Sequence, residues 1–274
     1  NVLDQVEDDS ISLNNTEEDY NDFEVDEDFT EEVITLENDN ILFEISTNGA
    51  DIKKLLLKDF NNYNDDPLFL VNNNKSIFSY NIPIGRNSII NSRDLNYSAE
   101  IIKDKSILKL TAVIDSQRSL ELTYSLEENS SILDFDLRLN DSDRNSTYDQ
   151  LELVWGKDSF RNSKSIDYEN RYTALSYGFE DEKDSWLSVA GTSNKNINNV
   201  NWISFREHFF SSILILNNET NNVEIKDGDI VKFNNVNQMN NNIIYDEYNF
   251  VSNKDFKNIF FEEKNKLINN FNLF

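Results

Sequence analysis

The chain of 274 residues contains no cysteine, one histidine, one methionine and two prolines. Without cysteine it has no disulfide, no thiolate nucleophile and no cysteine metal site. Its single histidine, His208, excludes a site that needs two histidines, as histidine-based zinc sites without cysteine do. A G-x-S-x-G motif, a signal peptide and an apolar run of the ~18–20 residues that span a membrane are also missing. The sequence therefore does not support the common serine or cysteine hydrolases.

Positive charge is scarce, because 25 Lys and Arg stand against 51 Asp and Glu, for a formal net charge of −26. An acidic surface repels phosphate backbones, so nucleic acid is not an expected partner. Fourteen acidic residues fall within residues 1–32, and the first basic residue is Lys53. Since this segment repels itself and is poor in apolar side chains, we predict a disordered acidic linker over 1–32. A tail that binds a basic partner is the alternative.

From Val33 onward, short runs of Ile, Val, Leu, Phe and Tyr alternate with polar residues, and clusters of Asn, Asp, Ser and Gly separate them. Examples are VITLENDNILFEIS (33–46), SILKLTAVID (106–115) and LELTYSLEE (120–128). Alternation with period two at short, even spacing is typical of a large antiparallel β protein rather than of βαβ units. We predict an all-β sandwich domain over residues 33–252.

The C-terminal residues 253–274 show a different pattern, in which apolar side chains recur at roughly helical spacing with Lys and Glu between them. This pattern predicts an amphipathic helix that starts near Ser252 or Asn253. One face should pack on the sandwich or on whatever follows in a longer chain. The candidate partner-binding residues on this face are Phe256, Ile259, Phe260, Leu267 and Phe271.

The segment DSDRNSTYDQLE, from Asp141 to Glu152, places oxygen-bearing side chains at the spacing of a calcium-binding loop. The candidate metal ligands are Asp141, Asp143, Asn145, Asp149 and Glu152. Ser146 stands where the sharp turn of such a loop wants glycine, and the flanking segments are typical of strands rather than of EF-hand helices. The preferred interpretation is a polar hairpin loop, with a weak calcium site as the alternative. No other cofactor is predicted.

The segment WISFREHFFSSIL (202–214) holds His208 among aromatic residues. Because no nucleophile motif or second metal ligand accompanies it, we interpret His208 as a residue of a packed strand. The candidate core or cleft aromatic residues are Trp155, Trp202, Phe205, Phe209 and Phe210. Glycosidase chemistry needs two carboxylates in a cleft, but with 51 acidic residues chance pairs are certain. Glu152, Asp167 and Glu169 are plausible only because aromatic residues stand near them in the sequence.

Four blocks, in order, resemble the bacterial YidC membrane-protein insertases. They are LENDNILFEISTNGADIKKLLLKDF (36–60), LELVWG (151–156), YENRYTALSY (168–177) and WISFREHFFSSILI (202–215). The resemblance covers about Val33 to Phe274, the large extracytoplasmic domain between the first two membrane spans of that family. The chain departs from the pattern at Gly49-Ala50, where the family has a Gly-Gly turn. His208 stands where the family usually carries glutamine, so the resemblance does not make it a required catalytic group.

The resemblance implies a large antiparallel β-supersandwich of the galactose mutarotase-like type, followed by a C-terminal helix that leads toward the next membrane span. It also implies a non-catalytic domain of an insertase and chaperone at the periplasmic face of the bacterial inner membrane, tethered by flanking transmembrane helices. The implied partners are SecD/SecF-type accessory proteins of the Sec translocon, nascent membrane proteins and the membrane-embedded remainder of the same protein. The insertase activity itself belongs to that membrane-embedded part.

Two other functions stay open on the sequence. A carbohydrate-binding or carbohydrate-active β-supersandwich protein would use the aromatic residues for stacking and the carboxylates for acid–base steps. Mutarotase-type catalysis uses histidines with a carboxylate, and a chain with one histidine cannot supply the pair. A calcium-dependent surface domain would use the Asp141–Glu152 loop and would lose stability without the metal.

Overall fold

The computed structural model of the chain describes residues 29–73, 76–84, 88–102, 106–141, 152–178, 185–188, 194–220, 223–226, 230–233 and 239–247. Residues 1–28 of the acidic segment and the predicted C-terminal helix, 253–274, lie outside these ranges. The helices and strands below belong to one compact unit, Glu31–Phe274. Neither helix of the described ranges has the length and apolar character required to cross a bilayer.

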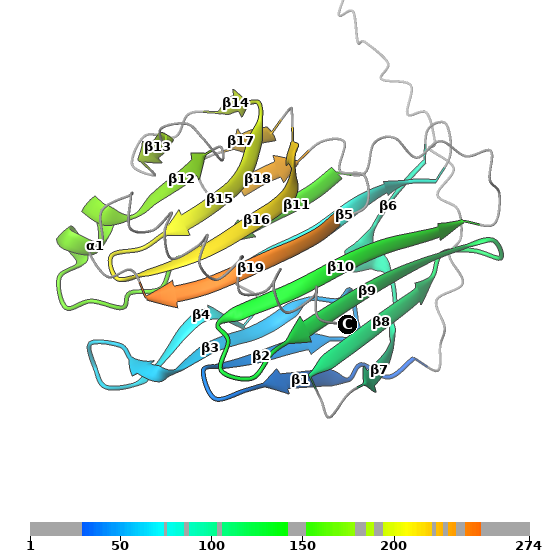
Figure 1. Cartoon of the computed structure of the whole chain (residues 1–274), viewed down its shortest axis with the longest axis horizontal. Helices are drawn as coiled ribbons and strands as arrows, with labels where there is room; N and C mark the ends of the chain where they lie inside the picture. Colours follow the sequence, from blue (N-terminus) through cyan, green and yellow to red (C-terminus); the bar gives the residue numbers. More distant parts are fainter. Residues whose placement is uncertain are drawn as a thin grey trace, which may run out of the picture. The chain divides into compact units, whose positions relative to one another are not determined.

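The described strands form three antiparallel sheets (Figure 1). The largest has the spatial order β13-β12-β15-β16-β19-β10-β9-β8-β7. Its strands are β7 (Ser98–Ile102), β8 (Ile107–Val113), β9 (Arg118–Leu126), β10 (Ile132–Asp141), β12 (Ala174–Gly178), β13 (Ser185–Ser188), β15 (Val200–Arg206), β16 (Phe210–Thr220) and β19 (Met239–Glu247).

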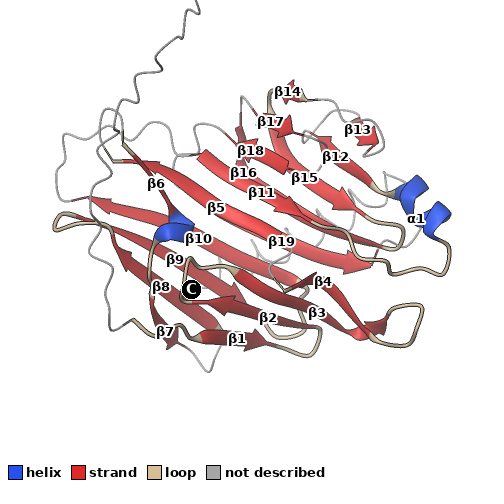
Figure 2. Ribbon diagram, turned by 180° about the vertical axis from the view of Figure 1, so that it is seen from behind, coloured by secondary structure: helices blue, strands red, loops and turns tan. Residues whose placement is uncertain are grey.

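The two smaller sheets lie on the same side of the nine-stranded sheet, as the view from behind shows (Figure 2). One has the order β14-β17-β18-β11-β5-β6 and the other the order β1-β2-β3-β4. Their strands are β1 (Val33–Glu37), β2 (Ile41–Ser46), β3 (Ile52–Asn61), β4 (Pro67–Asn72), β5 (Ser76–Pro83), β6 (Ile89–Asn91), β11 (Glu152–Lys157), β14 (Lys195–Ile197), β17 (Val223–Lys226) and β18 (Ile230–Phe233). A 3₁₀ turn, η1 (Ser92–Asp94), and one α-helix, α1 (Ile166–Tyr172), complete the described elements.

The core lies between the large sheet and the two smaller ones. In β9, Leu120, Leu122 and Tyr124 are buried and alternate with half-buried polar residues, because successive side chains of a strand point to opposite faces. The rings of Phe43 on β2 and Tyr124 lie 5.4 Å apart and join the four-stranded sheet to the large one. Each buried side chain of this kind stabilises the fold by roughly 1.5–3 kcal/mol. The predicted all-β sandwich is therefore confirmed.

Rings also join the six-stranded sheet to the large one. Phe78 on β5 meets Phe135 on β10 edge-on at 5.1 Å between centroids. Trp155 on β11 meets Phe205 on β15 edge-on at 4.6 Å. Edge-to-face pairs of this kind contribute about 0.5–1.5 kcal/mol beyond the area that they bury. Aromatic residues of four strands that are separate in the sequence are thus brought into one core.

The structure corrects two expectations about connections. The strands that flank the predicted hairpin loop do not pair with each other, because β10 pairs with β9 and β19 whereas β11 pairs with β5 and β18 in another sheet. His208 is not in a strand, because β15 ends at Arg206 and β16 begins at Phe210. Two strands show the same alternation of apolar and polar residues whether they pair with each other or belong to different sheets. Likewise, the sequence between β15 and β16 does not reveal whether one strand continues or a turn separates two strands.

Candidate functional site

An open depression of about 540 Å³ lies where the β3–β4 turn, the segment before α1 and the β15–β16 turn meet. Its volume is within the ~300–1,000 Å³ typical of ligand pockets. The lining mixes aromatic rings with amide, hydroxyl and amino groups, and none of its described residues carries a carboxylate. The lining residues are Asn61, Asn62, Tyr63, Asn162, Ser163, Lys164, Ser165, Tyr168, His208, Phe209 and Phe210.

The helix α1 places Tyr168 in one wall of this depression and Tyr172 against His208. Ser165 caps the helix by accepting the backbone N–H of Tyr168, and the N–H of Thr173 closes its last turn on the carbonyl of Glu169. Tyr168 and Tyr172 are four residues apart, so their rings lie on the same face of the helix. The ring of Tyr172 stacks on His208 at 4.9 Å and an interplanar angle of 5°. The turn that carries His208 is thereby fixed to the helix.

The rim of the depression exposes two large aromatic side chains. Tyr168 is 49% exposed and Phe209 is 45% exposed, while the Phe209 ring stacks on His208 at 4.0 Å. Two guanidinium groups cover other ring faces: Arg171 lies 5.1 Å from the Tyr168 centroid and Arg161 lies 4.7 Å from that of Tyr63. Such cation–π contacts contribute about 0.5–1 kcal/mol each at exposed positions. The rim thus presents flat rings bordered by positive charge.

A buried polar network stands behind the lining. The Nζ atom of Lys157, at the end of β11, lies 2.8 Å from Oε1 of Glu207 in the β15–β16 turn, and it donates to the Ser212 hydroxyl at 3.1 Å. The side-chain amide of Asn162 donates to Oε2 of Glu207 at 2.9 Å. Because a buried charge is costly unless it is paired and hydrogen-bonded, these partners hold Glu207 in one position. The turn that carries His208 and Phe209 is anchored in this way.

Glu169 fixes the opposite wall. Its side chain is buried and accepts the backbone N–H groups of Asn162 at 2.9 Å and of Ser163 at 3.0 Å, as well as the Ser163 hydroxyl at 3.2 Å. The carboxylate therefore satisfies the backbone N–H groups of the segment that leads into its own helix. Since Asn162 also contacts Glu207, the two walls of the depression share one network.

The structure does not bring the three sequence-selected carboxylates together. Asp167 is exposed on α1, and the carboxylate of Glu169 accepts hydrogen bonds from backbone N–H groups. Glu152 begins β11, about 16 Å along the strand from Lys157 at its end, since each residue of a strand rises ~3.3 Å. Its carboxylate accepts from the Asn81 amide and pairs with Lys232 at 3.1 Å. No acid–base pair is assembled from these three groups.

The candidate aromatic residues divide between core and depression. Trp155, Phe205 and Phe210 are buried, and Trp202 lies against Gly178, where an added Cβ would stand 2.6 Å from the indole. Phe210 meets the ring of Phe60 and reaches the floor of the depression, whereas Phe209 stands exposed at its rim. Sequence reasoning missed Tyr63, Lys164 and Tyr168; the available signal for Tyr168 was the pair of tyrosines at helical spacing in YENRY.

Two further candidate sets are only partly covered by the described residues. Among the proposed calcium ligands, Asp141 ends β10 and Glu152 pairs with Lys232, while Asp143, Asn145 and Asp149 lie outside the described ranges. Across those ranges no cluster of three or more His, Asp or Glu could hold a metal ion. The five C-terminal candidates, from Phe256 to Phe271, also lie outside the described residues.

Comparison with solved structures defines the class of fold. A galactose mutarotase-like protein from Lactobacillus casei superposes with a TM-score of 0.51 and 10% identity, over 79% of this chain and 100% of that one. A putative aldose 1-epimerase from Escherichia coli K12 gives a TM-score of 0.50 and 8% identity, over 80% of this chain and 100% of that one. Identities this low show the fold alone. The protein is a β-supersandwich of the galactose mutarotase-like type, as predicted.

The family model of the YidC periplasmic domain matches residues 33–245, and the chain belongs to this family. The membrane protein insertase YidC of Parabacteroides distasonis is 30% identical over 190 residues, which are 68% of this chain and 30% of that protein. The YidC of Porphyromonas gingivalis is 30% identical over 193 residues, with the same shares of 68% and 30%. The match thus spans 30% of the length of these curated relatives. Membership implies the periplasmic side of the inner membrane.

Proposed function

We propose that the chain is the non-catalytic docking domain of a YidC-type insertase and chaperone. Its partners are SecD/SecF-type accessory proteins of the translocon and nascent membrane-protein segments. Flanking transmembrane helices tether it to the membrane-embedded remainder of the same protein, where insertion takes place. The observation that carries the proposal is the depression of about 540 Å³ with exposed aromatic side chains on a member of the YidC periplasmic family.

The groups around the depression favour binding over catalysis. Glu169 and Glu207 stand behind the lining, where backbone amides and Lys157 already occupy their oxygens. A catalytic histidine usually has one ring nitrogen fixed by a carboxylate or carbonyl. The Nδ1 atom of His208 is shielded from solvent and has no hydrogen-bond partner among the described residues. His208 instead contributes a ring to the stack with Tyr172 and Phe209.

The exposed rings supply the type of contact that dominates protein recognition. Binding energy concentrates in a few aromatic and arginine side chains that become desolvated in the complex. Tyr168, Phe209, Arg161 and Arg171 form such a set around one depression. Tyrosine and phenylalanine have few rotatable bonds, so ordering them on binding costs less than ordering long flexible chains.

A second part of the proposal concerns the predicted C-terminal helix, 253–274, and its five apolar residues. Ile213 and Ile215 of β16 are buried although they alternate with Leu214, which belongs to the main core cluster. They therefore lie on the opposite face of the sheet. An apolar surface there suits the apolar face of an amphipathic helix. In this arrangement 1–32 is the acidic linker, 33–252 the sandwich and 253–274 the helix that couples the domain to the membrane region.

The test is co-purification from detergent-solubilised inner membrane with the tagged chain as bait. The bait is compared with a version that ends at Asn253, with Tyr168→Ala/Phe209→Ala, and with the control Val113→Ala, whose side chain is 74% exposed and does not line the depression. We expect SecD/SecF components to be enriched by the unaltered chain and the control, and to be reduced by the truncation and by the double substitution. Equal recovery by all four baits, or no recovery by any, would overturn the proposal.

A further inference from the structure

We infer that the depression binds extended peptide segments that carry an aspartate or glutamate beside an aromatic side chain. The inference rests on the proposed docking function and adds the site and the chemistry of the partner. Four properties of the depression lead to it: its charge, its rings, its rigidity and its hydrogen-bonding groups.

The one charged side chain among the described lining residues is opposite in sign to the net charge of the chain. The chain has about twice as many acidic as basic residues, yet the described residues of the lining include Lys164 and no carboxylate. Arg161 and Arg171 are not lining residues, but both are exposed and lie over the rings of the lining residues Tyr63 and Tyr168. Asp65, Asp66 and Asp167 belong to the adjoining segments, where they are solvent-exposed and do not line the depression. Complementary charge steers association and selects partners, so the ligand should bring a negative group to Lys164 and the two guanidinium groups.

The rings of the depression provide faces for a second aromatic group. Tyr172, His208 and Phe209 form a continuous stack, with centroids 4.9 Å and 4.0 Å apart. Phe209 ends this stack at the surface, and Tyr168 stands exposed on α1. Aromatic pairs favour offset or edge-on contact and are worth more than their buried area alone. An incoming phenylalanine or tyrosine side chain would desolvate both exposed rings at once.

The walls of the depression are held in place before any ligand arrives. Glu207 ties the β15–β16 turn to Lys157 and to Asn162, and Glu169 ties the segment before α1 to the helix. A preorganised site binds with less loss of conformational entropy than a flexible one. Buried ionic groups stabilise a fold poorly in general, so their concentration behind this one depression is consistent with a requirement for its shape.

The hydrogen-bonding groups favour a peptide over a sugar. Sugar hydroxyls donate hydrogen bonds and need acceptors, and the described lining residues supply amide and hydroxyl oxygens but no charged acceptor. The two carboxylates behind it are already used by Lys157, Asn162 and Ser163. A peptide backbone offers both donors and acceptors to the asparagine and serine side chains of the lining. Its acidic side chain would face Lys164.

The test is fluorescence anisotropy of the full chain with the labelled peptide Gly-Ser-Asp-Phe-Asp-Phe-Ser-Gly. Matched peptides carry Asn for Asp or Ala for Phe. We expect saturable binding of the first peptide, and binding about fivefold or more weaker for each matched peptide. Tyr168→Ala and Phe209→Ala should each weaken binding of the first peptide about fivefold or more, while Val113→Ala should leave it unchanged. Lys164→Glu should weaken the Asp peptide more than the Asn peptide.

Three outcomes would overturn the inference: no binding, equal binding of the three peptides, or equal binding by all the variants. A soluble oligosaccharide that binds in place of the peptides and is lost in Phe209→Ala would overturn it in favour of a sugar site. The same variants in the membrane co-purification separate the two proposals. If SecD/SecF components are still captured while the peptides fail, docking stands and this site assignment fails. If the peptides bind as expected and no component is captured, the site stands and the proposed partners fail.

Discussion

Lys157 and Glu207 form an ion pair whose side chains are 2% and 1% exposed, with Nζ and Oε1 2.8 Å apart. Removing one partner leaves a buried charge without compensation, which typically costs about 3–5 kcal/mol. We therefore expect Lys157→Met and Glu207→Leu each to lower the free energy of unfolding by about that amount, measured by urea denaturation. The double variant should lose clearly less than the sum of the two, because neither charge is then left alone.

The exposed pair Lys58–Glu37 is the matched control, with Nζ and Oε2 2.9 Å apart and side chains 30% and 56% exposed. Lys58→Met should change stability by less than about 1 kcal/mol, because water screens the pair. If Lys157→Met were as mild as Lys58→Met, the burial of the Lys157–Glu207 pair would not hold in solution.

Two buried tyrosines differ in whether their hydroxyl groups have a partner. The Tyr97 hydroxyl donates to the carbonyl of Ser92 at 3.0 Å, whereas the Tyr80 hydroxyl is buried without a partner among the described residues. Tyr97→Phe should therefore lower the free energy of unfolding by about 1 kcal/mol, and Tyr80→Phe should leave it unchanged or raise it by up to ~1 kcal/mol. Thermal and urea unfolding of the two variants check this. Equal destabilisation by both would mean that the Tyr80 hydroxyl has a partner after all.

The turn at Gly49-Ala50 has room for a side chain at one position only. Both residues have positive φ, 71° at Gly49 and 51° at Ala50. A Cβ at Gly49 would stand 2.7 Å from the carbonyl oxygen of Arg93, in addition to the left-handed strain of about 1–2 kcal/mol. Gly49→Ala should therefore cost about 2 kcal/mol or more. Ala50→Gly should change stability by less than about 1 kcal/mol, because relief of strain offsets the lost methyl burial and the added chain entropy.

Urea midpoints of these two variants give the comparison. A cost for Ala50→Gly as large as that for Gly49→Ala would show that the alanine methyl, rather than the backbone at Gly49, fixes the turn. Ala50, which replaces the second glycine of the Gly-Gly pattern, thus stands at the position of the turn where the structure tolerates a side chain.

Local pattern predicted the strands but not the contacts between distant segments. The alternation in β9 can be read from residues 118–126 because one face of the strand is buried and the other is not. The depression could not be predicted, since it joins Tyr63, Tyr168 and Phe209 from three segments that only the sheet order brings together. The Lys157–Glu207 pair could not be predicted either, because nothing in the sequence distinguishes a lysine that becomes buried from one that stays in water. The predicted hairpin between β10 and β11 is wrong, because strands show the same alternation whether they pair with each other or belong to different sheets.

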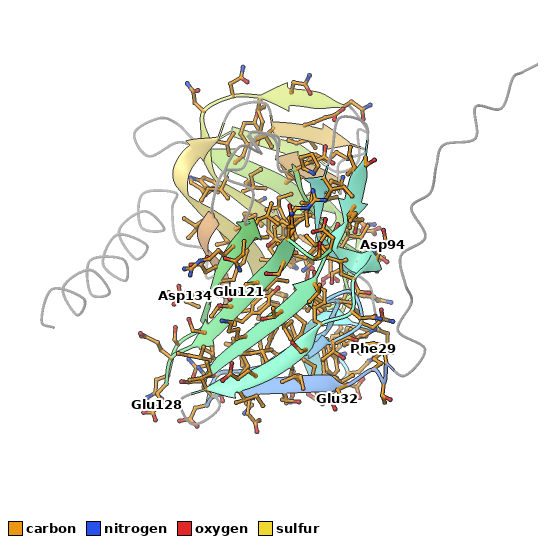
Figure 3. The ribbon with its side chains drawn as sticks, turned by 90° about the vertical axis from the view of Figure 1, so that its right-hand side faces the viewer. Phe29, Glu32, Asp94, Glu121, Glu128 and Asp134 are labelled. Atoms are coloured by element: carbon orange, nitrogen blue, oxygen red, sulfur yellow. The ribbon has the colours of Figure 1, made fainter. Side chains whose placement is uncertain are left out.

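The carboxyl group of Asp134 makes stability depend on pH. Its strand, β10, lies between β9 and β19, and Asp134 alternates with the core residues Leu133 and Phe135, so it lies on the outer face of the large sheet (Figure 3). Burial, and then the charge of Glu127, raise the pKa of Asp134 from 3.8 to about 6. The folded state therefore binds this proton more tightly than the unfolded chain does. The resulting stabilisation is fully present below pH 3.8 and is lost as the pH rises through about 6.

Asp134→Asn removes this titration. Relative to the unaltered chain, the variant should gain about 1–2 kcal/mol in the free energy of unfolding between pH 4 and pH 7. This gain is smaller than the free energy that corresponds to the whole pKa shift of Asp134, because the side chain keeps some contact with water. Urea unfolding at several pH values measures the difference, and Asp136→Asn, which removes a carboxylate from the same face of the same strand, is the control. If the difference in free energy of unfolding between Asp134→Asn and the unaltered chain stayed constant from pH 4 to pH 7, protonation of Asp134 would not be linked to folding.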